Sequence, residues 1–253
     1  MADPVRVLAF MAHPDDAEIL CSGTLTRLKR EAGCQIAIAT ATSGDCGTMD
    51  RRPDEIARIR HAEAVAAARL LGAEYYCAGC LDLLVVYDAP TIRAFVEILR
   101  KARPDVVITH SPVDYMVDHE MTSRLVRTAC FGGSAPNLLT GDIDPAPPTR
   151  AVPYLYYADP VEFKDILGRP VEPDFVVDVS GEIDTKVQCL ACHASQRDWL
   201  RAQHKMDHYI EMMKRAGAER GRRIGKAYGE GFRQHRGHAY PQDNIIARLL
   251  RME

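Results

Sequence analysis

The densest group of chemically active side chains in this sequence is His13-Pro14-Asp15-Asp16, which directly follows the apolar run 5–11. One imidazole and two carboxylates within four residues are donor types that bind Zn²⁺ in proteins. His13 and Asp16 can converge on one metal ion, while Asp15 stays free to take a proton from the water that the ion holds. The alternative is that Asp15 or Asp16 only caps the following helix, with His13 a polar residue at the end of a strand.

The element that must position these side chains is a buried strand. The run 5–11 is apolar, Pro14 interrupts it, and helix-forming residues follow, which predicts a strand, a tight loop and a helix. The loop then lies at the carboxyl end of a strand, where open parallel sheets bind ligands. A catalytic zinc has three protein ligands, so a third is expected from another strand end. His110 and His119 are the candidates, since both follow the strand expected over 105–110.

Strands and helices alternate along most of the chain, which predicts an α/β fold. We expect a single domain over 1–253 with a doubly wound, mostly parallel, Rossmann-like sheet flanked by helices and a helical C-terminal extension. The expected strands are 5–11, 35–42, 74–77, 105–110, 152–158 and 175–179, and the expected helices include 19–32, 53–71, 90–103, 180–193 and 197–216.

Two segments lack this alternation. Residues 132–150 are rich in Gly, Pro and Asp and predict a long loop, which in a compact domain is functional, disordered or a contact between subunits. A basic helical tail is expected over about 214–253, with eight Lys and Arg residues between 214 and 236. Such a charge run is a solvated helix face, or else a patch for an anionic substrate or another subunit. A homo-oligomer is a hypothesis that rests on these two segments.

Composition excludes some classes of protein. The 253 residues carry a net charge of −3, so the molecule lacks the positive field that nucleic-acid binding needs. No stretch approaches the roughly 20 apolar residues of a membrane span, and the N-terminus does not read as a secretory leader. We therefore expect a cytoplasmic protein whose eight cysteines are reduced thiols.

Four segments of the chain resemble one family. Ala12-His13-Pro14-Asp15-Asp16-Ala17-Glu18 resembles the signature of the PIG-L/LmbE-like zinc-dependent N-deacetylases, which remove acetyl groups from N-acetylglucosamine conjugates. Three later segments agree with it, namely Arg60-His61-Ala62-Glu63 with Leu71-Gly72, then Asp118-His119, and then His193-Ala194-Ser195-Gln196. The resemblance spans the chain from its start to about Gln196.

The resemblance implies a role for each residue of the predicted metal site. It selects His119 as the third metal ligand beside His13 and Asp16, and it makes Asp15 the general base. Asp118 would hold His119 in orientation from outside the ligand shell. Zn²⁺ is the expected ion, although His and carboxylate ligands also accept another divalent transition metal such as Fe²⁺.

The chain departs from the family three residues before His119. Many members have a histidine there that supports the oxyanion or acts as an acid, whereas this chain has Met116, which cannot donate a proton. Either the enzyme works with the metal and one carboxylate, or the role has moved to His110, Tyr115, His235 or His238.

Three residues are expected on the substrate side of the site. Arg60 matches a family arginine that faces the sugar, and Asp82 lies near the place of an aspartate that reads sugar hydroxyls. The alternatives are an exposed helix charge for Arg60 and a turn cap for Asp82. His110, at the end of its strand, is the third candidate for substrate binding.

The resemblance predicts a zinc-dependent hydrolase that removes an N-acetyl or other acyl group from an amino sugar or its conjugate. Metal-bound water would attack the amide carbonyl, with Asp15 as general base. One alternative is a metal-binding protein of the same fold with little turnover, and another is a deacylase of a non-sugar N-acyl small molecule. The presence of Asp15 argues against the first alternative, since a binding protein needs no base beside the metal.

Overall fold

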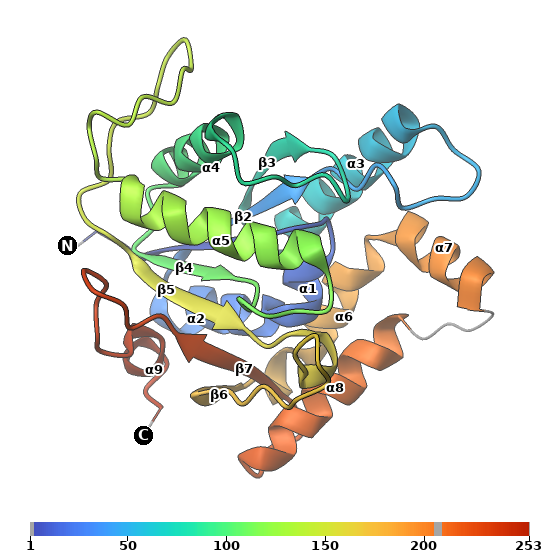
Figure 1. Cartoon of the computed structure of the whole chain (residues 1–253). Coiled ribbons are helices and arrows are strands. Elements are labelled where there is room, and N and C mark those ends of the chain that lie inside the picture. Colours follow the sequence, from blue (N-terminus) through green and yellow to red (C-terminus); the bar gives the residue numbers. More distant parts are fainter. Residues whose placement is uncertain (1–2, 205–208, 253) are drawn as a thin grey trace.

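The computed structural model describes residues 3–204 and 209–252, which form one seven-stranded sheet flanked by helices (Figure 1). The sheet has the order β3-β2-β1-β4-β5-β7-β6, and β7 alone runs antiparallel to its neighbours. This confirms the predicted mostly parallel α/β fold. The strands are β1 (Arg6–Met11), β2 (Gln35–Thr42), β3 (Glu74–Cys80), β4 (Val106–Thr109), β5 (Tyr154–Ala158), β6 (Phe175–Asp178) and β7 (Gly229–Gln234).

Helices cover both faces of the sheet and enclose two apolar cores. One core packs α4 and α5 on one face, and the other packs α2, α3, α6 and α9 on the opposite face (Figure 1). The helices are α1 (Asp16–Leu20), α2 (Ser22–Ala32), α3 (Pro53–Leu71), α4 (Ala89–Ala102), α5 (Val117–Gly132), α6 (Ile183–Ala191), α7 (Ala194–His204), α8 (Tyr209–Arg223) and α9 (Ile245–Leu249), with 3-10 turns at Val161–Phe163 and Ser180–Glu182. Among the described residues, no helix combines the length and the apolar composition needed to cross a lipid bilayer.

The order of the strands reverses at β1, which places a crevice at its carboxyl end. β1 pairs in parallel with β2 on one side and with β4 on the other. Both central strands are buried along nearly their whole length, as expected for apolar runs covered by helices on two faces. In open α/β sheets the crevice at such a reversal is the place where ligands bind. The His13 loop and the segment after β4 both open into it.

The C-terminal part differs from the predicted helical tail. α8 ends at Arg223, and β7 then enters the sheet between β5 and β6. Gly229 and Gly231 weaken the strand pattern, and Glu230 is a charged residue at a buried position, so the sequence carries little strand signal there. The helix expected over 197–216 is α7 and α8 instead, and its residues 205–208 lie outside the described part of the chain.

The expected helix 19–32 is also interrupted. α1 begins earlier, at Asp16, and the backbone leaves helical geometry at Cys21 before α2 begins. By contrast, α3 covers the expected range and ends at Gly72, which takes the left-handed conformation common at helix ends.

A long loop between α5 and β5 projects from the body of the protein (Figure 1). Residues 133–153 contain no helix or strand, and the start of the loop is held by Arg100 of α4. The Arg100 guanidinium donates hydrogen bonds to the carbonyls of Gly133, Ala135 and Leu138 at 2.7–3.0 Å. Its role as a contact between subunits stays a prediction.

A buried ion pair joins β7 to the helices on one face of the sheet. Lys186 Nζ lies 2.6 Å from Glu230 Oε1 and also donates to the carbonyl of Ile19. The Glu230 carboxylate accepts the backbone N–H groups of Gly23 and Thr24 at 3.0 and 2.7 Å, so it caps the first turn of α2. Together, the Glu230 and Lys186 side chains therefore link β7, α6, α1 and α2.

We expect Glu230→Gln to lower the free energy of unfolding by about 3 kcal/mol, because it leaves the buried Lys186 ammonium without a carboxylate. Urea denaturation followed by circular dichroism measures the change. Glu31→Gln is the matched control, since Glu31 pairs with Arg27 on the outer face of α2 and such pairs contribute at most about 1 kcal/mol. Equal losses in the two variants would contradict a special role for Glu230.

Candidate metal centre

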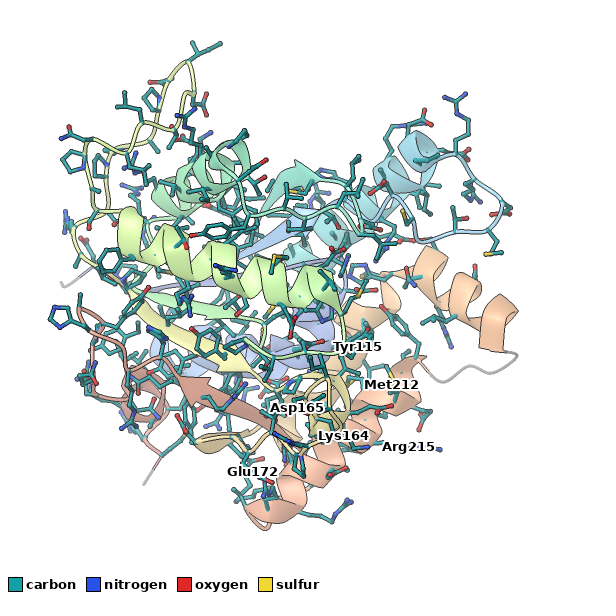
Figure 2. The ribbon with its side chains drawn as sticks, in the orientation of Figure 1. Tyr115, Lys164, Asp165, Glu172, Met212 and Arg215 are labelled. Carbon is teal, nitrogen blue, oxygen red and sulfur yellow. The ribbon has the colours of Figure 1, made fainter. Side chains whose placement is uncertain are left out.

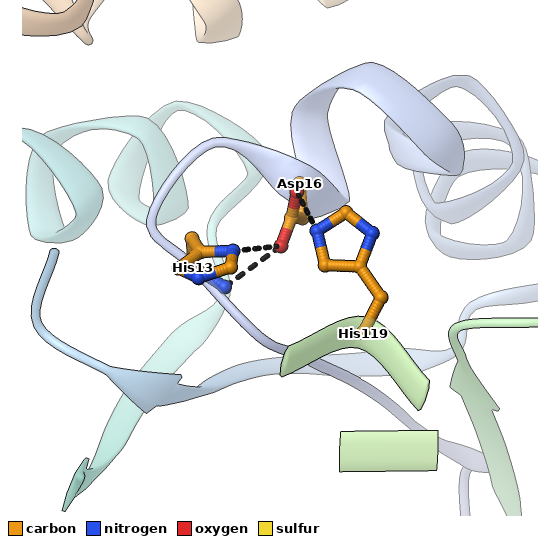
Figure 3. Close-up of side chains that lie close together, drawn as sticks. All are labelled: His13, Asp16 and His119. Atoms are coloured by element: carbon orange, nitrogen blue, oxygen red, sulfur yellow. Dashed lines mark hydrogen bonds and ion pairs between the residues drawn. The ribbon is translucent and has the colours of Figure 1, made fainter. Parts of the chain in front are cut away.

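His13, Asp16 and His119 meet at the carboxyl end of β1 (Figure 3). Asp16 Oδ2 lies 3.3 Å from His13 Nδ1, and Asp16 Oδ1 lies 3.5 Å from His119 Nε2. One ligand atom from each residue falls within 4.8 Å of the other two, which is close enough for a single ion to touch all three. The first two residues come from the β1–α1 loop, and His119 comes from the first turn of α5.

The loop holds this shape through an unusual backbone conformation at Asp15. Its φ of 108° is in the left-handed region, which Asp tolerates better than most residues although the conformation costs on the order of 1 kcal/mol. Asp16 Oδ2 accepts the backbone N–H of His13 at 2.7 Å and closes the loop. As a result, Asp15 stands apart from the group that His13 and Asp16 form with His119.

A carboxylate orients each imidazole from behind. Asp114 Oδ1 lies 3.0 Å from His119 Nδ1, and Asp118 Oδ2 lies 3.1 Å from His13 Nε2. The prediction that Asp118 orients His119 is therefore wrong, because Asp118 contacts His13 and Asp114 contacts His119. Adjacent residues on a helix do not face each other, so Asp118 points across to His13 instead. Asp114 is a residue that the sequence analysis missed, and no pattern in the sequence marked it.

The charges around the two imidazoles suit a cation. Burial alone would lower the pKa of His13, but hydrogen bonds that its ring donates to the Asp118 and Asp16 carboxylates raise it to about 10. Burial also opposes the charge of His119, yet Asp16 and Asp114 raise its pKa. Despite its own burial, Asp16 has a pKa well below its usual range because His119 and His110 favour its ionised form. Three carboxylates thus attract positive charge to one point, and the donor set of two nitrogens and one oxygen fits a divalent transition metal.

Asp15 occupies a separate, buried place beside this group. Its Oδ2 accepts a hydrogen bond from the Tyr209 hydroxyl at 2.5 Å and a longer one from Arg60 at 3.4 Å. Burial raises the pKa of Asp15, and the nearby Arg60 guanidinium opposes that rise. Tyr209 begins α8, almost 200 residues away in the sequence, so local spacing gave no sign of it.

A cavity of about 420 Å³ opens over the group and is lined by His13, Asp15, Asp16 and His119. Arg60 and Asp82, which are predicted to bind the substrate, line it too. The Arg60 guanidinium also donates to the carbonyl of Pro14 at 2.7 Å, and Asp82 Oδ2 accepts the backbone N–H of Cys46. Gln196, part of the family-like segment at 193–196, is a further lining residue that the sequence analysis did not assign.

His110 does not lie where substrate binding requires. Its side chain is fully buried, it does not line the cavity, and its ring stacks on His119 with centroids 3.9 Å apart. His110 Nε2 accepts the backbone N–H of Ala12 at 2.9 Å and lies 3.1 Å from Asp16 Oδ2. Because the residue follows β4 directly, its side chain is enclosed behind the candidate metal ligands, where it contacts Asp16 and His119.

Of the four residues considered as replacements at Met116, only Tyr115 reaches the cavity. Its ring contacts His119 edge-on with centroids 5.5 Å apart, and burial raises the pKa of its hydroxyl. His235 instead lies within hydrogen-bond distance of the Tyr157 hydroxyl, and His238 is exposed.

The sequence of this chain is similar to several known proteins. Residues 8–130 match the family model described as PIG-L, GlcNAc-PI de-N-acetylase. A diacetylchitobiose deacetylase from Thermococcus kodakarensis is 26% identical over 204 residues, covering 77% of this chain and 71% of the relative. A 4-oxalmesaconate hydratase from Pseudomonas putida is also 26% identical, over 229 residues, covering 86% of this chain and 82% of the relative.

A solved structure has the same arrangement of elements. The N,N'-diacetylchitobiose deacetylase from Pyrococcus horikoshii superposes with a TM-score of 0.76 and 26% sequence identity, covering 96% of this chain and 89% of that chain. The shared fold extends well beyond residues 8–130, to nearly the whole sequence.

Proposed function

We propose that this chain, whose residues 8–130 match the PIG-L family model, is a metal-dependent hydrolase that removes an N-acetyl or other N-acyl group from an amino sugar or its conjugate. The observation that carries this proposal is the meeting of His13, Asp16 and His119 within 4.8 Å, with the Asp15 carboxylate beside them but outside the group. The names of the Thermococcus and Pyrococcus relatives support an N-acetylated amino sugar as the substrate class.

His13, Asp16 and His119 are the residues that would hold the ion. Two imidazoles and one carboxylate suit Zn²⁺ and leave a coordination position open, although Fe²⁺ accepts the same ligands. When bound, such an ion supplies a Lewis acid that lowers the pKa of water and stabilises negative charge on an oxygen atom. Asp114 and Asp118 hold the two imidazole rings in place.

Asp15 is the proposed general base. It takes a proton from the attacking water and afterwards gives that proton to the departing amine nitrogen as the C–N bond breaks. In the described part of the chain, Tyr209 and Arg60 both donate their hydrogen bonds to Asp15 Oδ2. Asp15 Oδ1 therefore remains available to take the proton from the water. Tyr115 is the proposed donor to the carbonyl oxygen, since its hydroxyl lies at the cavity where Met116 cannot donate.

The proposal is tested by incubating the purified protein with N-acetylglucosamine, N,N'-diacetylchitobiose and N-acetylated amino acids, with and without a chelator. The expected result is the release of acetate and free amine in equal amounts from the sugars, and no release after chelation. If acetate is released only from the N-acetylated amino acids, the substrate is a non-sugar N-acyl compound and the proposed sugar substrate is wrong. Bound metal without any product would indicate a binding protein.

A hydratase is the second candidate function. It is favoured by the Pseudomonas relative, which matches a larger share of this chain than the Thermococcus deacetylase at equal identity. A base beside a metal ion can also direct water to a carbon–carbon double bond, which adds water without breaking an amide. Consumption of an unsaturated dicarboxylate without release of acetate would support this second function. The loss of the ultraviolet absorbance of the dicarboxylate measures its consumption.

Tyr209→Phe is expected to move the acid limb of the pH profile of kcat/KM to higher pH. A hydrogen bond from Tyr209 favours the ionised form of Asp15, so its removal raises the pKa of the carboxyl and the base is lost at a higher pH. Activity above that limb should stay within about tenfold of the wild type, since the proposed base itself is kept. Tyr228→Phe, at a tyrosine outside the cavity, is the control, and an unmoved acid limb in Tyr209→Phe would contradict the assigned role.

A further inference from the structure

A second cavity, of about 480 Å³, lies beside the one over the candidate metal centre. The side chains of Ile19, Leu20, Val161 and Met212 line both cavities and form the wall between them. Figure 2 shows Met212 between Tyr115, at the metal cavity, and Lys164 and Arg215, at the second cavity. A group bound at the metal centre can therefore continue past Met212 into this space.

The second cavity has mostly apolar walls. α1 supplies Ile19 and Leu20, the turn at Val161–Phe163 supplies its two apolar side chains, and α8 supplies Met212 and Met213. Small residues on α8 and β7 complete the lining and leave the volume open, namely Ala216, Gly217, Gly229 and Gly231. The volume falls within the range of about 300–1,000 Å³ typical of small-molecule sites.

The charges around the cavity do not select an ion. The two buried cations are already paired, Lys186 with Glu230 and Arg220 with Asp159, each at 2.6 Å. Lys164 and Arg215 are exposed at the rim, where the carboxylates Glu162 and Glu219 match them in number. Acidic and basic side chains thus balance around the cavity, and its apolar wall is the feature left to bind a ligand.

We propose that this cavity is a subsite for an alkyl or aryl substituent of the substrate. The inference rests on the proposed function, in which the metal centre binds an N-acylated amino sugar. The substituent belongs either to the acyl group or to the group on the anomeric oxygen, and both present the same apolar chemistry to the wall of Ile19, Leu20 and Met212. A small sugar such as N-acetylglucosamine would then be a poor substrate because it leaves the subsite empty.

Two substrate series test the proposal and identify the end of the substrate that carries the substituent. One series lengthens the acyl group of N-acylglucosamine from acetyl to octanoyl, and the other lengthens the alkyl group of N-acetylglucosaminides from methyl to octyl. We expect kcat/KM to rise about fourfold with each methylene in one series, as burial of a CH₂ group predicts. Values that stay level or fall in both series would overturn the subsite.

Ala216→Phe should remove this dependence on chain length, because the larger side chain fills the cavity from α8. Ala218→Phe is the matched control, as it adds the same side chain to the same helix at a position that does not line the cavity, and it should keep the dependence. Chain-length dependence that survives in Ala216→Phe would place the apolar contact elsewhere.

A binding measurement separates failure of this inference from failure of the proposed function. If no compound in either series is hydrolysed, the proposed function fails, but the affinity of the cavity can still be measured. Isothermal titration calorimetry would measure the affinity for two pairs of compounds. One pair is octyl and methyl N-acetylglucosaminide, and the other is N-octanoylglucosamine and N-acetylglucosamine. At least tenfold tighter binding of one long-chain compound supports the subsite, and equal affinities in both pairs overturn it.

Discussion

Asp15→Asn is expected to lower kcat for amide hydrolysis by about 10³-fold while leaving the metal content unchanged. The amide has the size and shape of the carboxylate, and Asn also tolerates the left-handed backbone conformation at φ 108°. It cannot take up the proton, so the chemical step loses its base. Steady-state rates measure the loss, and elemental analysis of the same protein sample measures the metal.

Asp54→Asn provides the control for Asp15→Asn. Asp54 is an exposed residue in the first turn of α3, so its amide variant should keep wild-type kcat. An Asp15→Asn enzyme that retains more than a tenth of wild-type kcat would remove Asp15 from the role of base. A variant that loses both activity and metal would instead make Asp15 part of the ion-binding group.

His119→Ala is expected to abolish both metal binding and activity. The substitution leaves only His13 and Asp16 as ligands and removes the one ligand that α5 contributes to this group. Two ligands from one loop hold an ion too weakly to survive purification, since catalytic zinc sites use three. Treatment of the wild-type protein with a chelator should give the same inactive state, and added Zn²⁺ should restore only the wild-type protein.

His238→Ala tests whether the loss is specific to the metal centre, because His238 is an exposed histidine that lies outside the cavity. It should keep one metal ion per chain and full activity. Full metal content in His119→Ala would contradict the proposed site. It would direct attention to Asp45, Cys46 and Asp82, which form another group with ligand atoms within 4.8 Å.

The two functions considered above show why the fold cannot decide the reaction. A deacetylase and a hydratase from other organisms match this chain at the same identity. Hydrolysis of an amide and hydration of a double bond both consume a water molecule, and the difference lies in the bond that the cavity presents to that water. Other residues that line the cavity, such as Tyr115 and Arg60, therefore carry more information about the reaction than the candidate metal ligands do.

The parts of the fold that the sequence predicted are those with a strong local signal. β1 and β4 are short apolar runs that must be buried on both faces, and α3 is bounded by Pro53 and Gly72. β7 has neither feature, because glycines and charged residues interrupt its pattern. It is a strand because β5 and β6 pair with its backbone, and that interaction is not visible in the local sequence.

The residues of the candidate site also differ in how strong a local sequence signal they carry. His13, Asp15 and Asp16 are close neighbours in the sequence, so their residue types and spacing predicted either a metal site or a helix cap, and the family resemblance favoured the metal site. Local spacing left His110 and His119 as equal candidates, and only the family resemblance selected His119. Tyr209 and Asp114 contact the site through tertiary packing, and neither has a sequence pattern that could have assigned it.

The position of β7 in the sheet has a consequence for the synthesis of this protein. β5 and β6 do not pair with each other, and both depend on a strand that leaves the ribosome after them. Until Gly229–Gln234 emerges, each presents unpaired backbone groups that invite contact with other nascent chains. Released chains that are truncated just before Gly229 should therefore bind chaperones more strongly than the full-length chain.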